Sequence, residues 1–229
     1  MIRAIVLAAG ASSRMGQAKA ALTLGQTGET VVARVIRTLL AGGAPEVLVV
    51  AGAHIDEVRK AMPAFAEASA FAAALADRTA GRPGAPRVRM LEHPGWQQGQ
   101  LSSLLAGLDA IDDPLLEAAM VTLVDVPLVT PATVAAVIAE WRKTRAPIVR
   151  PAMRAQNAQG AQGAGQSERH GHPVIFDRSV FQDLREADPN VGAKAVFAKH
   201  RPGIINVAVN DSGAFEDIDT PADYKRIRG

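Results

Sequence analysis

The first nineteen residues constrain this chain more than any other stretch. Residues 1–7 are apolar except for Arg3, and an apolar run rich in Ile and Val predicts a buried strand. The next six residues, 8–13, are small, so their backbone N–H groups can approach a ligand closely. Arg14 and Lys19 follow. A row of exposed N–H groups beside two cations predicts an anion site, with a triphosphate lying between the first strand and the first helix.

Two common phosphate-binding patterns do not fit this opening. A Walker A loop requires Lys to follow Gly and precede Ser or Thr, whereas Lys19 follows Ala18. A dinucleotide fingerprint requires three closely spaced glycines, and Gly10 and Gly16 are too far apart to supply them. The opening therefore predicts a phosphate site of another kind.

Aspartates follow predicted strands at two later places. Residues 120–124 read as a buried strand that ends at Asp125, and ligands bind at this end of the strands in open α/β sheets. Asp217 and Asp219 alternate with an apolar residue, so they share one face if the segment is extended. Carboxylate oxygens suit Mg²⁺, which makes Asp125 a candidate metal ligand.

Strand and helix patterns alternate along the chain. Strands are expected over 47–50, 87–91, 148–149 and 203–209, and helices over 30–41, 55–62, 131–141 and 193–198. This alternation predicts an α/β fold with a largely parallel sheet, and 229 residues suit one domain spanning 1–229.

Two stretches interrupt that alternation. Residues 64–86 are rich in Ala and then in Gly and Pro, and we expect a helix followed by a flexible surface insertion. Residues 154–169 carry almost no apolar bulk, so we expect a mobile loop there. That loop could be an inert insertion or a lid over a substrate.

Composition excludes several classes of protein. The net charge is +2, with both signs scattered along the chain, which predicts neither nucleic-acid nor membrane binding. Apolar runs stay well short of the roughly 20 residues of a membrane span. The chain has no Cys, which excludes thiolate metal sites and fits a reducing compartment, so we expect a cytoplasmic protein.

A loop with serines precedes one predicted helix, and a histidine pair follows the Gln/Ala/Gly loop. Either Ser102 or Ser103 could cap the helix that follows Gly99. His170 and His172 would face the same way on an extended segment. With no Cys and few acids nearby, zinc binding by this pair has little support.

The pattern Leu-Ala-Ala-Gly-x-Ser-Ser-Arg-Met-Gly-x-x-Lys over residues 7–19 resembles the signature of MobA-like nucleotidyltransferases. Four later segments are similar to elements of that family in the same order: 92–108, 125–128, 171–173 and 217–223. The opening looks closest to the branch that makes molybdenum cofactor from CTP and molybdopterin. His93 and Gln100 depart from the family pattern, which usually has Asn and often Met there.

The resemblance implies a fold, a cofactor and a set of site residues. The implied fold is a single-domain, Rossmann-like, three-layer α/β sandwich of the nucleotide-diphospho-sugar transferase type. Mg²⁺ would be held by Asp125 and Asp219, while Arg14 and Lys19 would hold the leaving pyrophosphate. The nucleotide would contact Leu7, Ala8, Ala9, Gly10, Ser12, Ser13, Arg14, Lys19, Gly52, Gln100, Ser102 and Ser103. The acceptor would contact Arg169, Gly171, His172 and Lys194.

Three functions follow from these expectations. The first is transfer of a nucleotide, with CTP as donor and molybdopterin as acceptor, and with a molybdoenzyme as a further partner. The second is nucleotide transfer to a sugar phosphate or another small phosphate. The third is a non-catalytic module that binds nucleotide or cofactor and delivers it to a molybdoenzyme.

Overall fold

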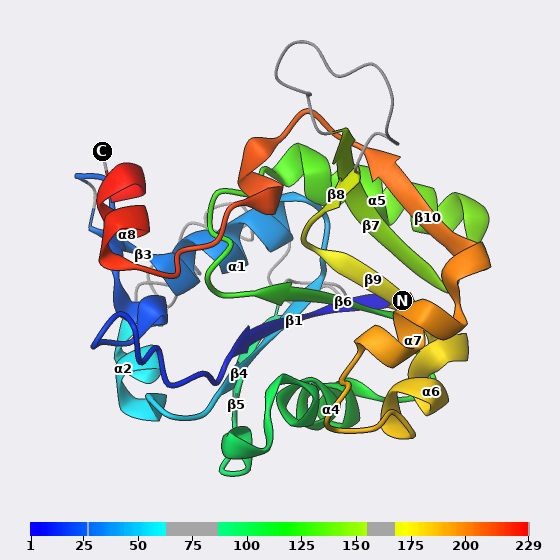
Figure 1. Cartoon of the computed structure of the whole chain (residues 1–229), viewed down its shortest axis with the longest axis horizontal. Helices are drawn as coiled ribbons and strands as arrows, with labels where there is room; N and C mark the ends of the chain where they lie inside the picture. Colours follow the sequence, from blue (N-terminus) through cyan, green and yellow to red (C-terminus); the bar gives the residue numbers. More distant parts are fainter. Residues whose placement is uncertain (27, 63–86, 155–167, 229) are drawn as a thin grey trace, which may run out of the picture.

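Strand β1 (Ile2–Ala8) lies inside the sheet around which the chain folds (Figure 1). The computed structural model describes residues 1–26, 28–62, 87–154 and 168–228. The other strands are β2 (Thr23–Leu24), β3 (Glu29–Thr30), β4 (Glu46–Ala51), β5 (Arg87–Glu92), β6 (Ala118–Leu123), β7 (Ile148–Arg154), β8 (Glu168–His170), β9 (Val174–Asp177) and β10 (Ile204–Ala208). The α-helices are α1 (Val31–Ala41), α2 (Ile55–Ala61), α4 (Gln100–Ile111), α5 (Pro131–Thr144), α6 (Phe181–Arg185), α7 (Lys194–Lys199) and α8 (Pro221–Arg228).

The main sheet is mixed but mostly parallel, with the strand order β10-β7-β9-β6-β1-β4-β5. Strand β1 pairs in parallel with β4 on one side and with β6 on the other. Strand β9 pairs antiparallel with β6 and with β7. The chain moves from β1 to β4 and β5 and later returns to β6 on the opposite side of β1, and a crevice opens at such a reversal of strand order.

The alternation of β1 side chains produces three layers (Figure 1). Ala4 and Val6 belong to a core with residues of α1 and α5, whereas Ile5 and Leu7 belong to a second core with residues of α4 and α6. Since successive strand residues point to opposite faces, a central strand must be apolar on both. This accounts for the unbroken apolar run at the start of the chain and confirms the predicted α/β sandwich.

Threonines cap two of the helices, α1 and α5. The Thr30 hydroxyl accepts a hydrogen bond from the Ala33 N–H at 3.2 Å, and the Thr130 hydroxyl accepts one from the Thr133 N–H at 3.3 Å. Pro131 occupies the first turn of α5. Such caps satisfy backbone donors that the first helical turn leaves free.

The predicted cap of α4 is wrong. The helix begins at Gln100, two residues before Ser102, and its N-cap is Gly99 with φ of +100°. That backbone conformation favours glycine, because a Cβ would strain it. The Ser102 hydroxyl instead donates back to the Gly99 carbonyl at 2.9 Å.

The predicted loop over 154–169 is too long at both ends. Strand β7 runs through Arg154, and Glu168 and Arg169 belong to β8, which pairs antiparallel with β7. The rest of the predicted loop, 155–167, and the whole of the predicted insertion over 64–86 lie outside the described residues.

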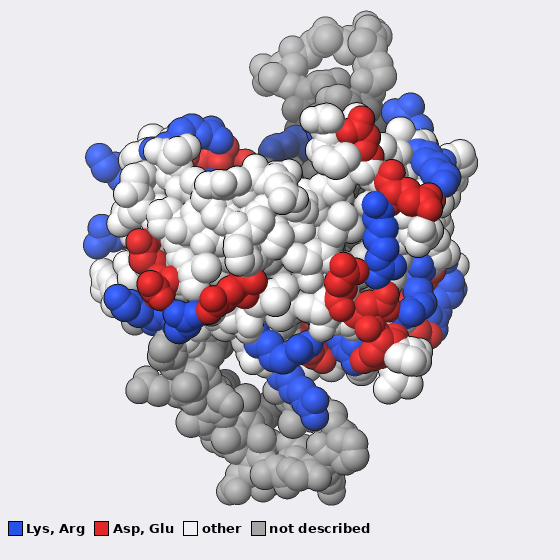
Figure 2. Space-filling view, turned by 90° about the horizontal axis from the view of Figure 1, so that it is seen from below, with Lys and Arg blue, Asp and Glu red and all other residues white. Residues whose placement is uncertain are grey.

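Charges of both signs mix on the surface. On the face in Figure 2, Lys and Arg lie beside Asp and Glu along the margins, and the middle of the face is largely uncharged. Ion pairs such as Arg185–Asp112, at 2.7 Å, contribute to this mixing. Within the described residues, none of the helices is both long and apolar enough to cross a bilayer.

The contact between α1 and α5 yields a stability prediction. A Cβ added at Gly42 would lie 2.4 Å from the Val134 side chain, so Gly42→Ala should lower the free energy of unfolding by about 1–3 kcal/mol through overpacking. Gly10→Ala is the control, because a Cβ there meets nothing within 4 Å. Urea unfolding of both variants measures the difference, and equal stabilities would contradict the close packing of α1 on α5.

Candidate active site

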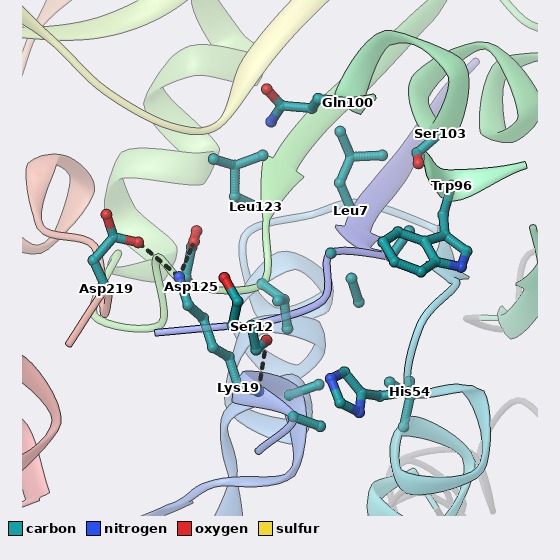
Figure 3. A pocket seen from close by; sticks show the side chains of 18 of the residues that line it. Leu7, Ser12, Lys19, His54, Trp96, Gln100, Ser103, Leu123, Asp125 and Asp219 are labelled. Atoms are coloured by element: carbon teal, nitrogen blue, oxygen red, sulfur yellow. Dashed lines mark hydrogen bonds and ion pairs between the residues drawn. The ribbon is translucent and has the colours of Figure 1, made fainter. Parts of the chain in front are cut away.

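A hollow of about 460 Å³ lies beyond the carboxyl ends of β1 and β6 (Figure 3). The loop that follows β1 lines one side of it, and the residues that follow β6 line another. Most of the residues predicted to contact a nucleotide line it: Leu7, Ala8, Ala9, Gly10, Ser12, Ser13, Arg14, Lys19, Gln100 and Ser103. Asp125 and Asp219, the predicted metal ligands, line it too.

Lys19 brings together carboxylates from distant parts of the chain. Its Nζ lies 3.0 Å from Asp125 Oδ2 and 2.7 Å from Asp219 Oδ1 (Figure 3). The Lys19 side chain is only 12% exposed, so solvent screens these ion pairs less than it would on an open surface. The backbone also joins the two segments, since the Ile218 N–H donates to the Asp125 carbonyl at 2.8 Å.

This arrangement shifts two pKa values. Burial disfavours the charge on Lys19, but hydrogen bonds to Asp219 and Asp125 outweigh burial and raise the Lys19 pKa above its usual 10.5. The hydrogen bond from Lys19 lowers the pKa of Asp219 below its usual 3.8, with a smaller contribution from Arg14. The charged forms of Lys19 and Asp219 are therefore both favoured near neutral pH.

Arg14 supplies a second cation at the mouth of the hollow. Its Nη2 lies 3.1 Å from Asp219 Oδ2, while its side chain remains 68% exposed. An exposed guanidinium whose ion pair lies at the rim of the hollow can exchange that partner for a phosphate at little cost.

The loop after β1 is held by its own backbone and by neighbouring segments. Ser12 adopts φ of +50°, and its hydroxyl accepts a hydrogen bond from the Lys19 N–H at 3.3 Å. The Ala9 carbonyl accepts from the Ala53 N–H at 3.1 Å. These bonds fix the direction of the loop without placing a bulky side chain in the hollow.

Gly52 supports the hollow without lining it. A Cβ on Gly52 would lie 2.6 Å from both the Ala9 carbonyl oxygen and the Trp96 side chain. Trp96 itself lines the hollow. Glycine at position 52 therefore permits two segments to pack against the end of β4: the loop that follows β1, and the Trp96 loop, residues 93–99 between β5 and α4.

The two predicted serines occupy different positions. Ser103 is only 4% exposed and lines the hollow from α4. The Ser102 hydroxyl donates to the Gly95 and Gly99 carbonyls, and it lies 3.0 Å from His93 Nε2. Ser102 therefore stabilises the Trp96 loop and is not among the residues that line the hollow.

A second hollow of about 460 Å³ adjoins the first and shares Leu7, Gln100 and Leu123 with it. Gly171, His172 and Lys194, which were predicted to contact an acceptor, line this second hollow. Arg169 does not line it: its guanidinium donates to the Phe215 carbonyl at 2.8 Å. A Cβ on Gly171 would lie 2.1 Å from the Ala214 carbonyl oxygen, so glycine permits this close approach.

His172 lines the second hollow, and its Nδ1 lies 3.5 Å from the Val121 carbonyl. Burial lowers the His172 pKa below 6.5, and the negative charges of Asp125 and Asp217 only partly offset this effect. The neutral imidazole is therefore favoured at pH 7, and His172 can donate or accept a hydrogen bond without adding charge.

The sequence predicted no site role for several residues that line the first hollow, among them His54, Trp96 and Leu123. The His54 ring donates through Nε2 to the Ala11 carbonyl at 2.8 Å, which ties α2 to the β1 loop. His54 lies just after β4 and Leu123 ends β6. Their place at the carboxyl ends of strands is the signal that could have identified them.

Comparison with known proteins gives the family. A model described as the MobA-like NTP transferase domain matches residues 4–203. The chain is 25% identical over 227 residues to a protein named nicotine blue oxidoreductase from Paenarthrobacter nicotinovorans, covering 99% of this chain and 96% of the relative.

Solved structures agree on the fold. Rv0371c from Mycobacterium tuberculosis H37Rv is 25% identical, with a TM-score of 0.70 and coverage of 99% of this chain and 97% of that chain. A structure of the same protein in complex with manganese is 24% identical, with a TM-score of 0.63 and coverage of 99% and 97%. A CMP:2-keto-3-deoxy-manno-octonic acid synthetase complexed with CTP is 15% identical, with a TM-score of 0.71 and coverage of 99% and 96%.

The small-residue loop after β1, the cations that follow it and the carboxylates that converge on Lys19 all line the first hollow. The family model covers these residues except Asp219, and it also covers the residues that line the second hollow. The chain belongs to the MobA-like NTP transferase family.

Proposed function

We propose that this nucleotidyltransferase moves CMP from CTP to the phosphate of molybdopterin and releases pyrophosphate. The observation that carries the proposal is the position of Lys19 between Asp125 and Asp219, beside the loop that follows β1. An anionic acceptor must approach an anionic nucleotide, so the first requirement is a site that neutralises negative charge.

The residues of the first hollow would meet that requirement. Backbone N–H groups of the β1 loop would bind the triphosphate, and Arg14 and Lys19 would bind the pyrophosphate as it leaves. Because the acceptor is itself an ionised phosphate, it needs no strong general base. The chain would act mainly by orienting the two reactants and by stabilising charge.

Asp125 and Asp219 fit a divalent cation. Asp125 Oδ1 is buried and has no hydrogen-bond partner within the described part of the chain, although a buried carboxylate oxygen is normally paired. Mg²⁺ would be held by these two carboxylates, and when bound it would neutralise phosphate charge between them. The manganese complex of the M. tuberculosis protein supports a divalent metal.

Different observations support CTP as the donor and molybdopterin as the acceptor. CTP is supported by the resemblance of the opening loop and by the CTP complex of a protein with the same fold. Molybdopterin is supported by the resemblance alone, while the second hollow offers His172 and Lys194 to a phosphate-bearing molecule. In the cell we would expect a molybdoenzyme to receive the product.

The first prediction concerns catalysis. Lys19→Met and Asp125→Asn should each lower pyrophosphate release from CTP and molybdopterin by about 10²- to 10³-fold, because each removes charge stabilisation at the transferred phosphate. Lys143→Met is the matched control, since Lys143 lies on α5 with its side chain 75% exposed. Circular dichroism should show that all three variants fold.

The donor and acceptor are tested in the same assay. Each NTP is supplied with and without molybdopterin, and release that needs both CTP and molybdopterin supports the proposal. Release with a sugar phosphate in place of molybdopterin would overturn the acceptor. Redox turnover of nicotine blue without any pyrophosphate release would overturn the activity and favour that of the oxidoreductase relative.

The second prediction separates the two serines. Ser103→Ala should raise the KM for CTP by about fivefold or more, a loss of roughly one hydrogen bond, because Ser103 lines the first hollow. Ser102→Ala should leave that KM within twofold, since the Ser102 hydroxyl is bonded to the Gly95 and Gly99 carbonyls. Steady-state kinetics measures the KM for CTP of both variants. A larger increase in Ser102→Ala than in Ser103→Ala would contradict the positions given to the two serines.

The third prediction concerns the ion pairs in the absence of metal. In Lys19→Met the Asp219 pKa should rise, because the hydrogen bond that lowers it most is lost. Carbon-13 NMR titration of the carboxyl group, with a chelator present, measures the shift. An unchanged Asp219 pKa would show that the pair with Lys19 does not form in solution.

The same pair makes stability depend on pH. A lowered Asp219 pKa contributes stability above about pH 3.8, and this contribution is lost as pH falls through the folded-state value. A raised Lys19 pKa contributes stability below about pH 10.5, and this is lost as pH rises through its folded-state value. Lys19→Met should therefore flatten both the acid and the alkaline limb of the unfolding free energy.

A further inference from the structure

Arg150 lies on β7 and lines the second hollow, two strands away in the sheet from β6, the strand that precedes Asp125. Its register partner on the adjacent strand is Asn206 of β10, and Arg150 Nε donates to the Asn206 side-chain oxygen at 3.0 Å. The guanidinium carbon lies 5.2 Å from the centre of the Phe197 ring. These two contacts fix the plane of the guanidinium, as a cation over an aromatic face is fixed.

Arg150 lies between the second hollow and a third hollow and lines both of them. The second hollow and a third one of about 660 Å³ share Arg150, His170 and Phe197 in their linings. The second hollow also shares residues with the nucleotide-facing hollow. A molecule that reaches toward Asp125 from the second hollow would thus have its remote end at Arg150.

The charge of Arg150 is incompletely balanced. Among the described residues it forms no ion pair, and the nearby Glu168 Oε2 is already within 3.1 Å of His170 Nε2 and accepts from the Asn206 amide at 2.7 Å. Burial lowers the Arg150 pKa, as does the positive charge of Arg201, while Glu168 raises it only in part. A partly buried cation beside a second cation favours a ligand with negative or partly negative oxygens.

We propose that Arg150 binds the end of the acceptor remote from the transferred phosphate, through an oxygen that is anionic or belongs to a carbonyl group. This inference rests on the proposed function for the position of the acceptor, and adds a requirement on its chemistry. Acceptors would need a phosphate at one end and an oxygen-bearing group at the other. Molybdopterin meets this requirement, because a pterin carbonyl lies far from its phosphate.

Kinetics tests the role of Arg150 in choosing the acceptor. Arg150→Met should raise the KM for molybdopterin at least tenfold and leave the KM for CTP within twofold. Arg150→Lys should give an intermediate KM, since an ammonium keeps the charge but not the planar fork. Arg87→Met, on the exposed start of the edge strand β5, is the control for loss of one positive charge.

A binding measurement tests the site without turnover. The Nε–Hε NMR signal of Arg150 is followed in the wild-type protein without nucleotide or Mg²⁺, as inorganic phosphate or molybdopterin is added. A saturable shift on adding inorganic phosphate indicates that Arg150 binds an anionic oxygen. A shift on adding molybdopterin, with no shift on adding phosphate, indicates that Arg150 binds the pterin carbonyl.

The outcomes separate this inference from the proposed function. If molybdopterin is not a substrate but phosphate shifts the Arg150 signal saturably, the proposed acceptor fails and the Arg150 site stands. If neither molecule shifts the signal, or if Arg150→Met leaves the molybdopterin KM unchanged, the inference is overturned even where pyrophosphate release is normal.

Discussion

The ammonium group of Lys19 lies between the carboxylates of Asp125 and Asp219 and joins three segments at the edge of the sheet where the parallel strands end. Lys19 follows the first strand, Asp125 follows the sixth, and Asp219 precedes the last helix, yet all three side chains meet within hydrogen-bonding distance. Two carboxylates this close would repel each other without a cation between them. The pairing stabilises the three segments in one arrangement and favours the ionised form of Asp219.

Much of the fold could be predicted from the sequence, because each element carries a local signal. The apolar run of β1, the threonine caps of α1 and α5 and the alternation of strands with helices all depend on neighbouring residues. The start of α4 could not be predicted from serines alone, since the positive φ of Gly99 sets it. The extension of β7 through Pro151 depends on pairing with β8 and β10, which are distant in sequence.

The site was partly predictable for the same reason. Residues at strand ends, such as Asp125, could be identified because parallel strands place their ends together. The separation of Ser102 from Ser103 depends on which side of α4 faces the hollow, and this requires the position of the helix. Arg150 carries no local signal: its importance arises from Phe197 and Asn206, which come from a helix and a strand much later in the chain.

The reversed direction of β9 has a consequence for how such a fold can diversify. Because β9 pairs antiparallel with β6, with Val174 opposite Val121, the segment Gly171–His172 that precedes β9 lies at the edge of the sheet where β6 and the strands parallel to it end. The loops that line the first hollow follow strands, whereas this segment, which lines the second hollow, precedes one. Substitutions in Gly171–His172 would therefore change the lining of the second hollow and leave the loop after β1 unchanged.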